Sequence, residues 1–146
     1  MVDLNKIKIK TGVLARTIKD WGSYKKEVGK LTEQIEAMKA SGQDEHDISH
    51  RQMCLDETLP MLPDTKTRLA KAIADLEGLI HSVPASETAT VENEIYKKGA
   101  ATLAEGKKLV EDIAKEEEEE RKRKEEEEKK KKEDEQKEKD KEKDGK

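Results

Sequence analysis

Two histidines and one cysteine form the set of residues in this chain that most resembles a metal site. His46, His50 and Cys54 are four residues apart, and on a helix residues four apart lie on one face. Two imidazoles and a thiolate are zinc ligands, but a structural zinc site needs four ligands and the sequence offers no evident fourth. His46 also precedes the expected start of its helix. We therefore favour solvated side chains over a zinc site and predict no bound metal.

Other reactive side chains are numerous but are not arranged for catalysis. Carboxylates abound, yet none stands alone among apolar residues, where burial would tune its pKa for proton transfer. No candidate nucleophile is accompanied by a base and an orienting group. No glycine-rich phosphate loop follows a strand. The sequence therefore predicts a protein that is not an enzyme, with no catalytic residues and no cofactor.

The composition limits the fold and the partners. Of 146 residues, 45% are charged and 32% hydrophobic, and the aromatic residues are one Trp and two Tyr. So little apolar material favours long helices that each bury a narrow seam. A net charge of −4 argues against nucleic acid as the main partner. No apolar run approaches the roughly 20 residues of a membrane span, and a single cysteine fits a reducing compartment. We expect a soluble cytoplasmic protein with no membrane partner.

Three long segments carry apolar residues at helical spacing. The first row is Ile7, Leu14, Trp21, Val28 and Ile35; the second is Ile48, Leu55, Leu62, Leu69, Leu76 and Val83; a weaker third holds Val91, Ile95, Tyr96, Leu103, Val110 and Ile113. Such rows predict amphipathic helices that pack along a common seam. We expect an all-α, elongated, spectrin-like antiparallel three-helix bundle, up-down-up, over residues 1–115. Its helices would cover about 4–40, 47–81 and 87–115.

Two prolines interrupt the second seam. A proline inside a helix costs about 3 kcal/mol and removes a backbone donor. Because the seam keeps its phase across Pro60 and Pro63, we predict one helix kinked there rather than two separate helices. Either Asp64 or Thr65, which follow, can help to satisfy the amides that the kink leaves free.

Glycines within the first and third segments leave two interpretations open. Gly22, Gly29, Gly99 and Gly106 lie at helix positions, where each costs about 1 kcal/mol relative to alanine. Either a neighbouring helix approaches closely, or the helix is simply softer at these places.

After Ala114 the chain consists almost entirely of charged residues. Glu125–Glu128 are followed by Lys129–Lys132, so that each glutamate has a lysine four residues later, a pairing that contributes about 0.2 to 0.5 kcal/mol. We predict that residues 116–146 form a tail, a solvated helix to about Lys132 that then frays. Full disorder is the alternative.

Lysines alternate with isoleucines near the start of the chain. Lys6, Lys8 and Lys10 can bind an acidic partner or can form the solvated beginning of a helix. Ile9 falls between them and off the seam, which predicts an apolar side chain on or near the surface.

These segments resemble the tubulin-binding cofactor A family. The resemblance rests on IKIKTGVL (Ile7–Leu14) with Tyr24, on Asp47 and Ile48, on MLPDTKTRLAKA (Met61–Ala72) and on NEIYKKG (Asn93–Gly99), and it covers Lys6 to about Ile113. It implies small three-helix proteins that capture β-tubulin after the cytosolic chaperonin and pass it on toward αβ-dimer assembly. Pro60 is additional to the single proline of the family pattern, and the charged tail has no counterpart in it.

The resemblance also implies partners and a tentative contact set. The partners would be β-tubulin and, by handover, other tubulin-folding cofactors, in the cytoplasm and in the pathway that supplies the microtubule cytoskeleton. The tubulin-contacting residues would be Lys8, Ile9, Lys10, Thr11, Asp64 and Arg68. Pro60 and Pro63 would shape the bend.

Heptad rows of this length leave a second hypothesis open. A structural coiled-coil scaffold that associates with itself would carry similar rows. The two short turns favour seams that satisfy one another within one chain. We therefore expect a monomer or weak dimer, and sedimentation equilibrium distinguishes this from a long obligate oligomer.

Overall fold

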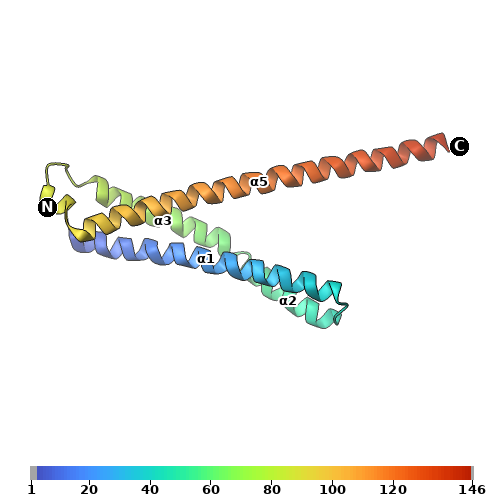
Figure 1. The fold of residues 1–146 in the computed structure, drawn as a ribbon, viewed down its shortest axis with the longest axis horizontal. Helices are drawn as coiled ribbons and strands as arrows, with labels where there is room; N and C mark the ends of the chain where they lie inside the picture. The colour runs from blue at the N-terminus through green and yellow to red at the C-terminus, as the bar shows by residue number, and fades with distance from the viewer. Residues whose placement is uncertain (1–2, 146) are drawn as a thin grey trace. The chain divides into compact units, whose positions relative to one another are not determined.

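The structure is a computed structural model that describes residues 3–145 and consists of helices joined by turns (Figure 1). The helices are α1 (Leu4–Ala40), α2 (Glu45–Thr58), α3 (Met61–His81), the single-turn α4 (Thr88–Val91) and α5 (Glu94–Asp144). No strand occurs among the residues described, in agreement with the all-α prediction. Within residues 3–145, no helix has the length and apolarity to cross a membrane. The chain divides into two compact units, Met1–Lys108 and Leu109–Lys146.

Side-chain caps fix where three of the helices begin. The Asp3 carboxylate accepts hydrogen bonds from the amides of Asn5, at 3.0 Å, and Lys6, at 3.4 Å. Asp44 caps α2 by accepting from the amide of His46, so α2 begins at Glu45 rather than at the expected residue 47. Asn93 accepts from the amide of Ile95 at 2.9 Å, so α5 begins at Glu94 rather than at the expected residue 87, and α4 is a separate turn before it. Short polar side chains end one helix and start another because they satisfy amides that lack intrahelical partners.

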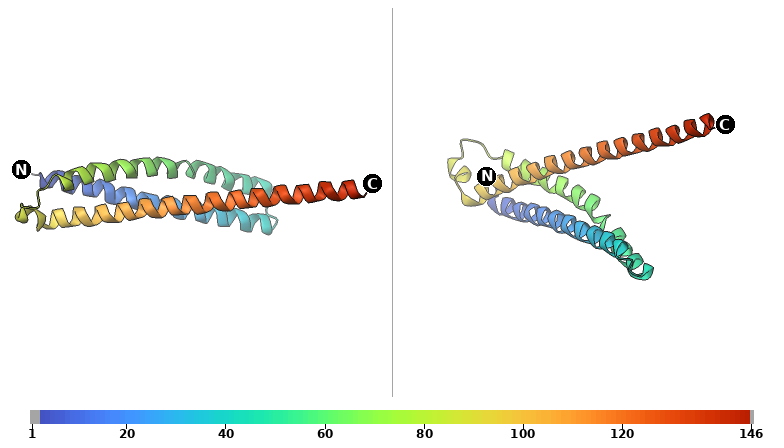
Figure 2. Two further views of the ribbon diagram at one scale, coloured as in Figure 1. Left: turned by 90° about the horizontal axis from the view of Figure 1, so that it is seen from above. Right: turned by 45° about the vertical axis from the view of Figure 1, so that its right-hand side comes forward.

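In the first unit, α2 and α3 lie one after the other along α1 (Figure 2, left). Lys10 near the start of α1 pairs with Asp75 late in α3, and Asp20 pairs with Arg68 early in α3, so the two helices are antiparallel. Their interface buries Ile7, Leu14, Leu69 and Leu76 completely. Further along α1, Leu31 and Ile35 pack with Leu55 of α2. The heptad rows therefore supply the core of this unit, although Val28, Ile48 and Leu62 are only partly buried. Val110 of the weaker third row is 37% exposed, contrary to the prediction.

The second segment is two helices, where the sequence suggested one kinked helix. Leu59 and Pro60 form a turn between α2 and α3, and Pro63 stands in the first turn of α3. Each proline lacks an amide hydrogen, so Pro63 cannot donate to the carbonyl of Leu59. The amide of Leu62 donates to that carbonyl at 3.2 Å. A proline is tolerated in a first turn, where amides have no intrahelical partner. Two prolines three residues apart thus favour a fresh helix start over continuation.

Two glycines let the first turns of α5 approach α1 and α3. A Cβ on Gly99 would stand 3.0 Å from Cγ2 of Ile7 and 3.3 Å from Cδ1 of Ile80. One on Gly106 would stand 3.2 Å from side-chain atoms of Leu14 and Ile73. At Gly22 and Gly29 a Cβ would meet nothing within 4 Å. Close approach therefore explains the glycines of α5 and not those of α1.

The second unit consists of the remainder of α5 and the residue after it that the structure describes. Every described residue from Ala114 onward is exposed. Glu118 pairs with Lys122 at 3.6 Å and Glu120 with Lys124 at 3.4 Å, both across four residues. The helix continues to Asp144, beyond the fraying point predicted at Lys132. Interactions across one turn persist there, since Gln136 donates to Asp140 at 3.2 Å.

Candidate functional site

The histidines and the cysteine of the sequence pattern do not come together as a site. His46 and His50 are exposed, whereas Cys54 is partly buried and packs against the cluster of Leu31, Ile35 and Leu55. Residues 3–145 hold no group of three or more His, Cys, Asp or Glu side chains placed to share a metal ion. Cys54 thus behaves as a small apolar residue of the helix interface.

Glu77 of α3 is a carboxyl with an altered acidity. Lys107 of α5 donates a hydrogen bond from Nζ to Oε1 of Glu77 at 2.6 Å, and this bond lowers the pKa of Glu77. A lowered pKa keeps the carboxylate ionised at neutral pH, which is opposite to what a general acid requires. The pair therefore links α3 to α5 and offers no acid–base chemistry.

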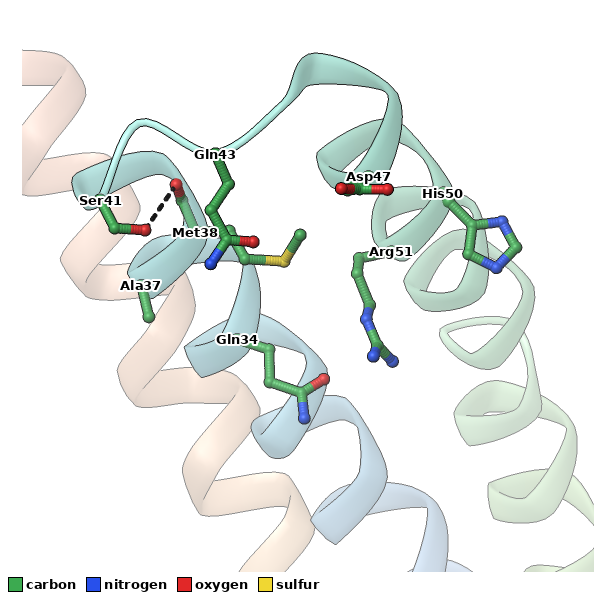
Figure 3. A pocket seen from close by; sticks show the side chains of 8 residues that line it. All are labelled: Gln34, Ala37, Met38, Ser41, Gln43, Asp47, His50 and Arg51. Carbon is green, nitrogen blue, oxygen red and sulfur yellow. Dashed lines mark hydrogen bonds between the residues drawn. The ribbon is translucent and has the colours of Figure 1, made fainter.

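An open hollow lies where α1 turns into α2 (Figure 3). It encloses about 680 Å³, and its walls include Gln34 and Met38 from α1 and His50 and Arg51 from α2. In Figure 3 the Arg51 side chain reaches toward Gln34 on α1. Gln34 Oε1 is buried and accepts no hydrogen bond from the residues described. The hollow has an unsatisfied acceptor but no nucleophile paired with a base.

A groove between α1 and α3 brings two of the predicted contact residues together. The groove has a volume of about 420 Å³, and both Lys10 of α1 and Arg68 of α3 line it. Lys10 Nζ lies 3.5 Å from Asp75, and Arg68 lies 3.9 Å from Asp20 and 3.3 Å from Asp64. Asp64, another predicted contact residue, does not line the groove itself but is paired with Arg68, which does. The pairs of Lys10 with Asp75 and of Arg68 with Asp20 connect α1 to α3, whereas the pair of Arg68 with Asp64 lies within α3.

A second hollow adjoins this groove and contains Ile9. Its volume is about 360 Å³, it is lined by Ile9, Lys6 and Leu79, and it shares Lys10 and Asp75 with the groove. Ile9 is 56% exposed, as expected for an isoleucine that falls off the seam. A single exposed isoleucine is common on protein surfaces, so Ile9 is a candidate contact residue because of its place beside the groove and not because of its exposure alone.

The remaining predicted residues lie elsewhere. Thr11 is 4% exposed and donates its hydroxyl to the carbonyl of Ile7 at 2.7 Å, so its side chain belongs to the core. Lys8 is exposed, but residues two apart on a helix do not face the same way, so it points away from Lys10. Pro60 and Pro63 are exposed at the break between α2 and α3.

Sequence reasoning missed several residues of the groove. Arg16, Lys19 and Lys71 line it, as does Asp75, the partner of Lys10. Their types were visible in the sequence as polar residues beside the apolar rows. No signal in one sequence gives the register of α1 against α3, which decides that Lys10 meets Asp75.

The fold and this surface define a class of protein. The described residues form an all-helical protein whose hollows are open to solvent and carry charged side chains at their walls. Open, shallow hollows of this kind favour contact with the surface of another molecule over enclosure of a small ligand.

Comparison with known proteins identifies the family. The model of the family "Tubulin binding cofactor A" matches residues 3–103, and the chain belongs to this family. It is 33% identical over 116 residues to "Tubulin-folding cofactor A" of Arabidopsis thaliana, which covers 80% of this chain and 95% of that protein. It is 40% identical over 100 residues to "Tubulin-specific chaperone A" of Gallus gallus, and the match covers 68% of this chain and 89% of that protein.

A solved structure agrees with this assignment. The crystal structure of tubulin folding cofactor A from Arabidopsis thaliana superposes with a TM-score of 0.64 at 30% identity. The match covers 72% of this chain and 95% of that one. The family resemblance seen in the sequence is confirmed.

Proposed function

We propose that this chain is a tubulin-folding chaperone of the cytoplasm. It captures β-tubulin after release from the cytosolic chaperonin and passes it, by handover to other tubulin-folding cofactors, toward assembly of the αβ dimer. The observation that carries this proposal is the family match over residues 3–103. The names of the relatives, tubulin-specific chaperone A and tubulin-folding cofactor A, support the folding role.

The working part is residues 1–115, which we propose to be an up-down-up bundle. In this bundle α2 and α3 run antiparallel to α1, with a bend at Pro60 and Pro63. The start of α5 runs parallel to α1. The antiparallel ion pairs between α1 and α3 support the first two directions. The contacts of Gly99 with Ile7 and of Gly106 with Leu14 support the third. Residues 116–146 are an extension.

The tubulin contact surface is proposed on α1 and α3. Lys8, Ile9, Lys10, Asp64 and Arg68 have exposed or part-exposed side chains that a partner can reach. The side chain of Thr11 is buried and bonds to the backbone of α1, so we propose that Thr11 supports the helix beneath this surface and does not touch tubulin. The chaperone holds β-tubulin in stoichiometric amounts, and holding stabilises only the form that is bound.

Self-association as a coiled-coil scaffold is less well supported. Ile7, Leu14, Leu69 and Leu76 of the heptad rows are fully buried within the first unit. A scaffold would need such rows free for a second chain. We therefore propose a monomer or weak dimer, and a long obligate oligomer in sedimentation equilibrium would favour the scaffold.

Capture of chaperonin-released tubulin tests the function. The purified chain is mixed with newly released β-tubulin, with α-tubulin as control, and the complexes are separated by size. We expect preferential retention of β-tubulin. Equal retention of both subunits, or of neither, would end the proposal. Lys8→Glu combined with Lys10→Glu tests the contact surface, and unchanged capture would remove these two lysines from it.

A further inference from the structure

The groove between α1 and α3 is strongly basic although the chain as a whole is acidic. Together with the hollow around Ile9, it is lined by six cationic side chains and two carboxylates, Asp20 and Asp75. The cations are Lys6, Lys10, Arg16, Lys19, Arg68 and Lys71. The net charge of the whole chain is −4. We call this surface the basic groove.

Most of the positive charge in the basic groove is not neutralised. Asp75 pairs with Lys10 at 3.5 Å and Asp20 with Arg68 at 3.9 Å. Lys6, Arg16, Lys19 and Lys71 have no carboxylate of the described residues within 4.0 Å, and all four are exposed. Unpaired cations gathered along a groove raise the local concentration of anionic groups. The groove therefore favours an acidic ligand.

An apolar spot lies at one end of the basic groove. Ile9 is 56% exposed and lines its hollow together with Leu79, between Lys6 and Lys10. Covering such a side chain releases about 25 cal/mol for each Å² removed from water. A ligand that fits both features carries carboxylates and at least one apolar side chain.

We infer that the basic groove binds an acidic peptide segment of the captured protein, with an apolar side chain of that segment seated between Ile9 and Leu79. The identity of the captured protein rests on the proposed chaperone function. Binding of an acidic segment does not, because it follows from the charges and the apolar spot alone.

Nucleic acid fits the basic groove less well. Asp20 and Asp75 stand among the cations, and a peptide backbone can donate hydrogen bonds to them, whereas a phosphodiester backbone has no donor to offer. The lining residues include no aromatic ring on which a base could stack. The glutamates of a second copy of this chain also fit poorly, since the sequence after Ala114 offers no apolar residue for the spot at Ile9.

Fluorescence anisotropy of the full chain with a short labelled peptide tests the inference. The peptide consists of glutamates around a central leucine, and a second peptide has serine in place of leucine. We expect the leucine peptide to bind more tightly, and binding to weaken as salt rises from about 0.05 to about 0.5 M. A labelled DNA duplex of similar charge is the competing ligand, and equal or tighter binding of DNA would overturn the peptide assignment.

Matched charge reversals locate the binding. Arg16→Glu with Lys71→Glu alters the basic groove, and Lys97→Glu with Lys98→Glu makes the same charge change at exposed residues of α5. We expect about tenfold weaker peptide binding for the first pair and less than about twofold for the second. Equal losses for both pairs would mean unspecific attraction and would overturn the inference. Circular dichroism checks folding, and Arg16→Gln with Lys71→Gln serves if the reversed pair unfolds.

Matched serine variants test the apolar spot. Ile9→Ser removes it, and Met53→Ser changes an equally exposed side chain on α2, which is 60% exposed. We expect about fivefold weaker binding for Ile9→Ser and little change for Met53→Ser. Capture of β-tubulin is measured on the same samples. If the chain captures β-tubulin but does not bind the peptide, the inference is overturned and the proposed function stands. If it binds the peptide but does not capture β-tubulin, the proposed function is overturned and the inference stands.

Discussion

Gly99 of α5 lies so close to Ile7 of α1 that a Cβ added to the glycine would stand 3.0 Å from Cγ2 of Ile7. The same Cβ would stand 3.0 Å from Oγ1 of Thr11, which is held by its hydrogen bond to the carbonyl of Ile7. Ile7 is fully buried, so it has little room to move aside. The absence of a side chain at Gly99 sets how closely these helices approach.

Alanine at this position is therefore expected to destabilise the protein. Gly99→Ala gains about 1 kcal/mol of helix propensity but crowds Ile7 and Thr11, and overpacking costs about 1 to 3 kcal/mol. We expect a net loss of about 1 kcal/mol in the free energy of unfolding, measured by urea denaturation. Gly22→Ala, where a Cβ meets nothing within 4 Å, should gain up to about 1 kcal/mol. Equal gains for both variants would show that the α5 interface is loose.

Truncation of a buried leucine should separate core from surface. Leu69 is fully buried whereas Ile9 is 56% exposed. Leu69→Ala should lower the free energy of unfolding by about 2 to 5 kcal/mol. Ile9→Ala should change it by no more than about 0.5 kcal/mol. Chemical denaturation measures both, and a large loss for Ile9→Ala would place Ile9 in the core and argue against its role in the basic groove.

The bond between Lys107 and Glu77 should make stability depend on pH in the acid range. Lys107 lowers the pKa of Glu77 below its ordinary value of 4.5 in the folded state. The stability from this pair is therefore fully present above pH 4.5 and is lost as pH falls through the lower folded pKa. Carboxyl NMR titration should show a low pKa for Glu77 that rises toward the ordinary value in Lys107→Gln. Lys108→Gln, one residue along, is the control, and a rise there of equal size would refute the pairing.

The charged end of α5 should be helical as an isolated peptide. Pairs such as Glu118 with Lys122 and Glu120 with Lys124 are spaced by four residues, and each contributes about 0.2 to 0.5 kcal/mol at low salt. A peptide of residues 116–146 should show helical circular dichroism that weakens as added salt screens the pairs. A peptide of the same composition, reordered so that like charges stand four apart, should be less helical. Coil spectra for both at low salt would contradict the structure.

The spacing of the apolar residues is enough to predict which faces of the helices are buried. A spacing of seven residues assigned four apolar side chains to the seams, and all four are fully buried: Ile7, Leu14, Leu69 and Leu76. This works because helix geometry fixes which residues share a face, whatever the helix packs against. By the same reasoning Ile9 falls outside the seam and is exposed.

The residue that lies opposite each side chain depends on how the helices pack, and the sequence pattern does not contain it. The tertiary structure shows the proline-bearing segment as α2 and α3: the two prolines disfavour a continuous helix, and the turn at Leu59 and Pro60 lets both helices pack along α1. It separated Gly99, which is closely packed, from Gly22, which is not. It also set Lys10 against Asp75. A heptad row fixes a face but not the register or partner of that face, since sliding one helix along another leaves both rows buried and changes every pair beside them.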